Sequence, residues 1–179
     1  MYSLEKHYND IIQQDLILTG NLSTVSLLPR QEKVKLCLGG NSSDDGYILG
    51  CLAALNIITG QKPIFTQQQP VEHRENTSRE VVGAKITLRR SRMYGFLEKL
   101  LLEVLPYAKQ FEGLRAPAHN NIYCFTLKDM FTFHELVPLF PYFEELSSLQ
   151  CQFHFTTKTE ADVVVLGNSL QLCFIPKKS

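Results

Sequence analysis

The stretch 83–106 constrains the fold most strongly, because its hydrophobic period changes within a few residues. Its first part alternates, with Ala84, Ile86 and Leu88 on one side and polar or basic residues on the other. This alternation predicts a half-buried β-strand. From Met93 to the proline at position 106, apolar residues recur at the spacing of a helix buried along one face. The apolar residues of this predicted helix are Met93, Leu97, Leu100, Leu101, Val104 and Leu105.

Four cations lie within eight residues at the strand-to-helix corner, and no acid stands between them. They are Lys85, Arg89, Arg90 and Arg92. A solvated charge run is the simplest interpretation of such a cluster taken alone. The same stretch contains Ser91, which we expect to cap the predicted helix. Thr87 shares the predicted outward side with Lys85 and Arg89.

A second strand is predicted at 33–38, where the alternation repeats. Apolar residues at even positions face inward, and Lys33, Lys35 and Cys37 face outward. Two strands that each carry basic residues opposite an apolar side favour a functional cationic surface more than either strand alone. Cations, hydroxyls and amides on a rigid sheet suit contacts with phosphate and with the ribose 2′-hydroxyl.

The charge of the chain is neutral overall but uneven along its length. Lysine and arginine total 18, as do aspartate and glutamate. Residues 61–92 nevertheless hold 7 basic against 3 acidic residues, a local charge of +4. Overall neutrality argues against an isolated nucleic-acid-binding domain, whereas the local excess supports one, because phosphate responds to local potential.

The remaining pattern predicts one α+β domain over 1–179, with a largely antiparallel sheet. Helices would cover one face, and the polar, basic face would stay open for RNA. A long polar loop is predicted at about 67–82, where large apolar residues are scarce. Further predicted elements are an N-terminal helix with the stripe Leu4, Tyr8, Ile11, Ile12 and Leu16, a helix at 47–59 closed by Gly60, strands at 121–127 and 150–157, a short helix within 142–149, and a final helix with Thr157 and Glu160 at capping-box spacing.

The chain lacks the residue patterns of an enzyme, a metal protein or a membrane protein. Its five histidines share no metal-ligand spacing, and no phosphate-binding loop or glycine-rich dinucleotide motif occurs. The five cysteines are scattered and predicted to be reduced, so we expect no cofactor and no zinc site. No apolar run is long enough to cross a membrane, and the N-terminus resembles neither a secretory signal nor a transit peptide.

Several segments, taken in order, resemble the ribosomal large-subunit protein family that binds 5S ribosomal RNA, the fifth large-subunit protein in the bacterial naming. Any one segment is weak, but GQKP followed about twenty residues later by a KITLR-like strand with RMYGFL is specific. The matching segments are HYND at 7–10, LPRQEKVKL at 28–36, GQKP at 60–63, GAKITLRRSRMYGFLEKLL at 83–101, FEGL at 111–114, FP at 140–141 and FTTKTEAD at 155–162.

The resemblance implies a structural protein of the ribosome's central protuberance that binds 5S ribosomal RNA and large-subunit ribosomal RNA beside neighbouring ribosomal proteins. In the family, the loop after GQKP approaches the peptidyl-site transfer RNA and the head of the small subunit. Arg90 stands where the family typically has glycine, and Lys35 is added from the strand pattern. By matching position, the implied RNA contacts are Lys33, Gln61, Lys62, Lys85, Thr87, Arg89 and Arg92.

The departures from the bacterial pattern suggest an organellar member of the family. Bacterial members are basic, whereas this chain is neutral, and its 67–80 segment carries two arginines against three glutamates. We therefore expect a mitochondrial ribosomal protein, encoded in the organelle. The alternative is a ribosome-associated protein-interaction module that kept the fold and lost most of its RNA contacts.

Overall fold

The chain folds into two compact units in the computed structural model. The first comprises Met1–Val34, Leu88–Phe125 and Gln152–Ser179, and the second comprises Lys35–Thr87 and Thr126–Cys151. The single domain expected from the sequence stays a prediction, and most of the predicted 67–82 loop lies outside the described residues. The structure describes residues 2–20, 22, 24–40, 44–67, 81–109, 111, 113–115, 121–146, 148–157, 160–172 and 174–175.

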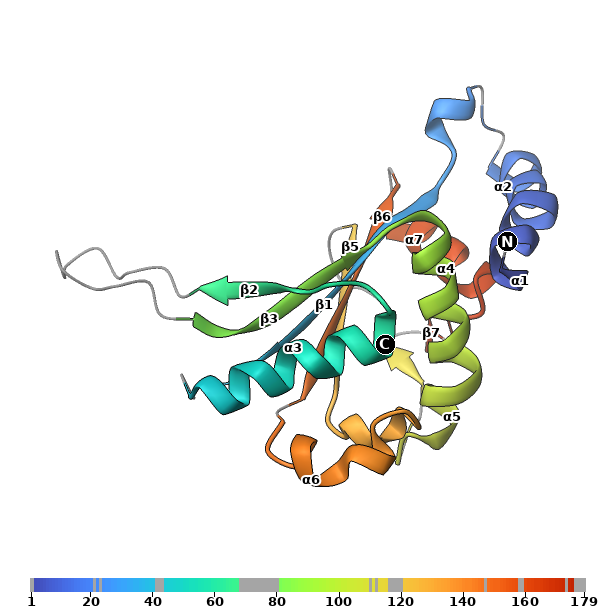
Figure 1. The fold of residues 1–179 in the computed structure, drawn as a ribbon. Coiled ribbons are helices and arrows are strands. Elements are labelled where there is room, and N and C mark those ends of the chain that lie inside the picture. Colours follow the sequence, from blue (N-terminus) through green and yellow to red (C-terminus); the bar gives the residue numbers. More distant parts are fainter. Residues whose placement is uncertain are drawn as a thin grey trace, which may run out of the picture. The chain divides into compact units, whose positions relative to one another are not determined.

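An antiparallel five-stranded sheet has the strand order β2-β3-β1-β6-β5 (Figure 1). Ile64 pairs with Lys85 across the two antiparallel strands β2 and β3, and the register shifts between Thr66 and Gln67. This sheet, together with several helices, confirms the predicted α+β class. The strands are β1 (Arg30–Gly39), β2 (Ile64–Gln67), β3 (Val81–Leu88), β5 (Ile122–Leu127) and β6 (Leu149–Thr156), and β4 (Leu114–Arg115) pairs in parallel with β7 (Phe174–Ile175).

Alternating burial along the strands confirms the predicted period of two. Leu36 in β1 and Leu88 in β3 are fully buried, whereas Lys85 between the buried positions of β3 is exposed. Phe153 in β6 is also fully buried, and its ring stacks on that of Phe125 at a centroid distance of 5.4 Å. Aromatic residues of β5 and β6 therefore form part of the core rather than a surface for stacking bases.

Helices of the first unit contain two π-helical segments that the sequence pattern did not predict. Leu4, Tyr8, Ile12 and Leu16 are buried at a constant spacing of four, whereas the predicted core residue Ile11 is 49% exposed. Hydrogen bonds from i to i+5 place more residues in each turn than an α-helix does, which keeps this spacing on one face. The elements are α1 (Ser3–His7), the π-segment Tyr8–Ile12, α2 (Gln13–Gly20), α4 (Arg90–Lys99), the π-segment Leu100–Val104, α5 (Leu105–Tyr107) and α7 (Glu160–Ser169), with a 3₁₀ turn at Val25–Leu27.

The second π-segment corrects the predicted core of the helix after the arginine corner. Leu97, Leu100 and Val104 are fully buried as expected, but Leu101 is only half-buried. The π-turn that starts at Leu100 rotates Leu101 away from the buried face.

Two predicted helix caps are wrong because their hydroxyl groups have partners elsewhere in the first unit. Ser91 Oγ donates to Glu5 Oε2 at 2.9 Å, and the helix begins one residue earlier, at Arg90. Thr157 Oγ1 donates to Asn121 Oδ1 at 2.7 Å rather than capping α7. Local spacing identified residues that can cap, but tertiary neighbours decided which groups they bind.

The second unit contains α3 (Asp45–Thr59), which confirms the predicted helix at 47–59. Gly60 ends it with φ of 63°, a left-handed conformation that glycine adopts without steric cost. The helix predicted within 142–149 is wrong, since a helix ends at Phe143 and β6 begins at Leu149. Prolines stand in first turns here and so begin helices rather than break them. These short elements are the 3₁₀ turns Met130–Thr132 and Val137–Leu139, followed by α6 (Phe140–Phe143).

Candidate RNA interface

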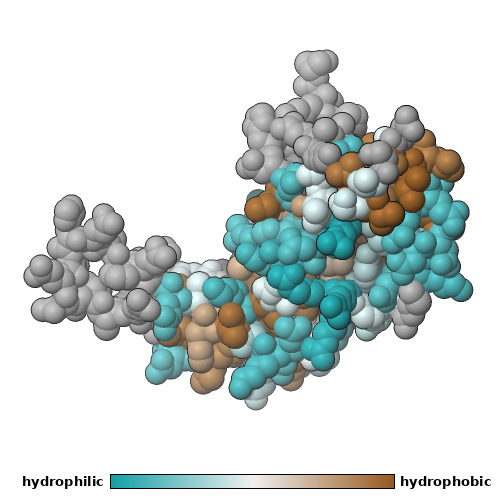
Figure 2. Space-filling view, turned by 90° about the horizontal axis from the view of Figure 1, so that it is seen from above, coloured by the Kyte–Doolittle hydropathy of each residue, from teal (hydrophilic) through white to brown (hydrophobic). Residues whose placement is uncertain are grey.

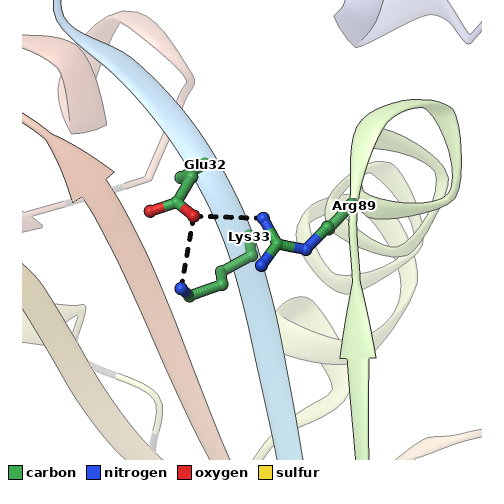
Figure 3. Close-up of polar contacts among 3 residues, drawn as sticks. All are labelled: Glu32, Lys33 and Arg89. Carbon is green, nitrogen blue, oxygen red and sulfur yellow. Dashed lines mark hydrogen bonds and ion pairs between the residues drawn. The ribbon is translucent and has the colours of Figure 1, made fainter.

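The cations of the first unit surround one carboxylate that sequence reasoning missed. Arg89 Nη1 lies 3.0 Å from Glu32 Oε1, and Lys33 Nζ lies 3.2 Å from the same oxygen (Figure 3). Arg89 follows β3 and Glu32 lies in β1, which neighbours β3 in the sheet. No acid separates the cations along the chain, but strand pairing brings this one between two of them. The available signal was Glu32 beside Lys33 in a strand expected to pair near Arg89.

Glu32 remains ionised at neutral pH. Hydrogen bonds from Arg89 and then from Lys33 hold the pKa of its carboxyl below the usual range. A carboxylate that accepts from cations is favoured in its charged form. The three side chains together therefore carry a net charge of +1 rather than the +2 that the sequence pattern suggested.

Arg90 and Arg92 lie at the beginning of α4, and both side chains are exposed. No acidic residue occupies the first turn of this helix. Positive charge at a helix N-terminus is unfavourable, because the helix dipole presents its positive end there. An anion bound beside these arginines would offset that cost.

Arg90 adopts a left-handed backbone conformation, with φ of 52°. This region favours glycine, and a residue with a Cβ pays about 1–2 kcal/mol to enter it. The conformation accounts for the glycine that the resemblance places at this position.

Replacing Arg90 with Gly is expected to raise the free energy of unfolding by up to about 1 kcal/mol. Relief of the left-handed conformation exceeds the roughly 0.5–1 kcal/mol of extra backbone entropy that glycine loses on folding. Urea unfolding measures the change. Arg92→Gly removes the same charge from an ordinary helical position and should instead cost about 1 kcal/mol. Equal losses in the two variants would contradict a strained Arg90.

The second unit holds the other predicted RNA contacts on and beside β1 and β3. Lys62 and Lys85 are exposed, and Lys35 and Thr87 are half-buried. Gln61 Nε2 donates to the backbone oxygen of Thr87 at 3.2 Å, which ties the turn after α3 to β3. The Gln61 side chain therefore has an intramolecular structural role, whereas the two exposed lysines have charges available to a ligand. RNA contact by all of these residues stays a prediction.

The surface also exposes apolar side chains. Figure 2 shows hydrophobic residues among hydrophilic ones in the view that it draws. Leu18 and Val25 of the first unit are 80% and 81% exposed, and Leu49 of α3 is 63% exposed. Single apolar residues are normal on a protein surface, so only a continuous stripe of them indicates a partner. Within the described part of the chain, no helix combines the length and apolar character needed to cross a membrane.

Comparison with known proteins first defines the class, which is that of ribosomal proteins. The family model for the C-terminus of the ribosomal uL5 proteins matches residues 81–174. The chain belongs to the uL5 family of large ribosomal subunit proteins, whose role is structural rather than enzymatic. This finding confirms the resemblance drawn from the sequence.

Relatives of the chain include mitochondrial and bacterial proteins. The large ribosomal subunit protein uL5m of Reclinomonas americana, a mitochondrial form, is 30% identical over 96% of this chain and 97% of its own length. The uL5 protein of Helicobacter hepaticus is 36% identical over 76% of this chain and 78% of its own. That of Mycoplasma pneumoniae is 30% identical over 76% and 79%. These relatives support a large-subunit protein without deciding its compartment.

Proposed function

We propose that this protein binds 5S ribosomal RNA and adjoining large-subunit ribosomal RNA in the central protuberance of a mitochondrial large ribosomal subunit. The observation that carries the proposal is the placement of cations opposite buried apolar residues on β1 and β3. Lys85 and Arg89 are exposed, while their neighbours Ile86 and Leu88 are buried. Phosphate contacts of this kind supply much of the affinity for RNA and position the protein on it.

Replacing Lys85 and Arg89 together with Gln is expected to weaken binding to 5S ribosomal RNA and to make its salt dependence shallower. Each lost phosphate contact lowers the slope by roughly 0.7–0.9, so the pair should lower it by about 1.4–1.8. Filter binding across a salt series measures both quantities. Lys109→Gln with Lys128→Gln removes the same charge from exposed positions outside the predicted site and should change the slope little. An unchanged slope in the first variant would remove these residues from the RNA interface.

Co-sedimentation of the protein with large ribosomal subunits tests the wider assignment. The mitochondrial location is supported by the neutral charge of the chain and by its mitochondrial relative. Fractionation of organelles followed by a sucrose gradient should place the protein in the large-subunit peak. Its absence from that peak would contradict the proposed function.

The 67–82 loop is proposed to contact protein rather than transfer RNA. Between 67 and 80 it holds two arginines and three glutamates, a charge of about −1 with histidine neutral. A negative segment is repelled by an RNA backbone. Contact with head proteins of the small subunit is therefore favoured over contact with peptidyl-site transfer RNA. Photocrosslinks from Arg74 or Arg79 in intact ribosomes distinguish the two.

A second candidate function, a protein-interaction module with few RNA contacts, is favoured by the outer side of α3. No charged residue lies between Asp45 and Lys62, and Leu49 and Ile57 are 63% and 37% exposed at a spacing of two helical repeats. A helix apolar on both faces is usually covered on both. RNA phosphate would find no cation on this stripe. Normal RNA affinity of the Lys85 and Arg89 double variant, with retained co-sedimentation, would favour this candidate.

A further inference from the structure

Two cations from neighbouring strands converge on a single carboxylate oxygen in the first unit. Lys33 Nζ and Arg89 Nη1 both contact Glu32 Oε1, at 3.2 and 3.0 Å (Figure 3). Arg89 is separated from Glu32 by 57 positions along the chain, so the pairing of strands creates this arrangement. The ammonium and the guanidinium thus hold one anionic oxygen between them.

The carboxylate in this position is weakly held. The side chains of Arg89 and Glu32 are 55% and 41% exposed, and that of Lys33 is 20% exposed. Ion pairs in contact with water contribute little net stability, because solvent and salt screen them. A second anion that offers several oxygens to the same donors can therefore replace the carboxylate.

A backbone phosphate has the chemistry to compete for this place. A guanidinium binds phosphate through two parallel N–H donors, whereas Arg89 reaches Glu32 through Nη1. If Glu32 stayed in place, its negative charge would lie beside the incoming phosphate and oppose it. Exposure of Glu32 allows its side chain to rotate into water once its partners are taken.

We propose that Lys33 and Arg89 form a phosphate-binding pair that Glu32 occupies in the free protein, and that an RNA backbone phosphate displaces Glu32 on binding. The inference rests on the proposed RNA-binding function and adds an internal competitor to it. Glu32 then lowers RNA affinity and the number of counterions released. It also keeps the two cations in place before RNA arrives.

Replacing Glu32 with Gln tests the proposal, because the amide keeps the shape of the side chain and removes its charge. Affinity for 5S ribosomal RNA at low salt is expected to rise roughly three- to tenfold, and the salt slope to steepen by up to about 0.9. Glu103→Gln is the matched control, since Glu103 is an exposed acid of the same unit outside the cluster. Equal gains in the two variants, or a loss in Glu32→Gln, would overturn the proposal.

A second set of variants tests whether the gain acts through the two cations. In a chain that already carries Lys33→Gln and Arg89→Gln, Glu32→Gln should no longer raise RNA affinity beyond the Glu103→Gln control. A gain that persists at full size would mean that Glu32 repels RNA independently of these residues, and would overturn displacement.

Titration with inorganic phosphate separates failure of this inference from failure of the proposed function. The carboxyl ¹³C resonance of Glu32 should move toward that of an unpaired glutamate as phosphate is added, while that of Glu103 stays in place. A wild-type protein that binds no 5S ribosomal RNA would contradict the proposed function, and the phosphate titration would then decide the pair by itself. A Glu32 resonance that does not respond to phosphate would overturn it.

Discussion

Replacing Leu97 with Ala is expected to lower the free energy of unfolding by about 2–5 kcal/mol. Leu97 is fully buried in α4, so the variant loses the transfer free energy of the removed atoms and leaves a cavity that its neighbours fill only in part. Urea unfolding followed by circular dichroism measures the change.

Two leucines in the next turn provide matched controls for this prediction. Leu102 is 65% exposed, so its replacement by Ala should cost less than about 1 kcal/mol. Leu101 is half-buried, and its replacement should give an intermediate loss. A loss at Leu101 as large as that at Leu97 would mean that the π-helical segment does not rotate Leu101 out of the core.

Replacing Gly83 with Ala is expected to cost about 3 kcal/mol, because β1 passes too close to β3 for a side chain. A Cβ at Gly83 would lie 2.6 Å from Gly39 Cα and still nearer the backbone oxygen of Leu38. These are backbone atoms of a neighbouring strand, so they cannot move aside as a flexible side chain would. The unfolding free energy of the variant measures the cost.

Gly46 provides the control for Gly83. A Cβ there would meet only Asp44 Oδ2, at an ordinary 3.5 Å. Alanine favours the first turn of α3 over glycine, so Gly46→Ala should raise stability by roughly 0.5–1 kcal/mol. If both glycines tolerate alanine equally, the strands are not as close at Gly83 as the structure places them.

The prediction for Glu32 bears on how a neutral protein binds an anionic partner. Its 18 basic and 18 acidic residues give no net attraction at long range. Affinity must therefore come from short-range contacts, where one misplaced acid has a large effect. Glu32 is such an acid, and its exchange for phosphate would let the chain remain neutral when free and still bind RNA.

The sequence by itself determined the features that follow from local periodicity. A period of two placed Val34 and Leu36 in the core and Lys33 and Lys35 opposite them, and burial in the structure agrees. Gly60 marked the end of α3 for an equally local reason, since a left-handed residue favours glycine. The sequence motifs also identified the family, which the comparisons confirm. Which of the exposed residues bind RNA stays a prediction.

Only the tertiary structure decided which groups meet across long separations in the chain. Glu32 reaches Arg89, and Ser91 binds Glu5 instead of capping its own helix. The π-segments, which turned Ile11 and Leu101 away from the core, depend on how the helices pack. Hydrophobic period specifies which side of an element is buried, because that depends on neighbours along the chain. It carries no information on which side chain of another strand or helix will face a given charge, and that pairing set the charge of the candidate site.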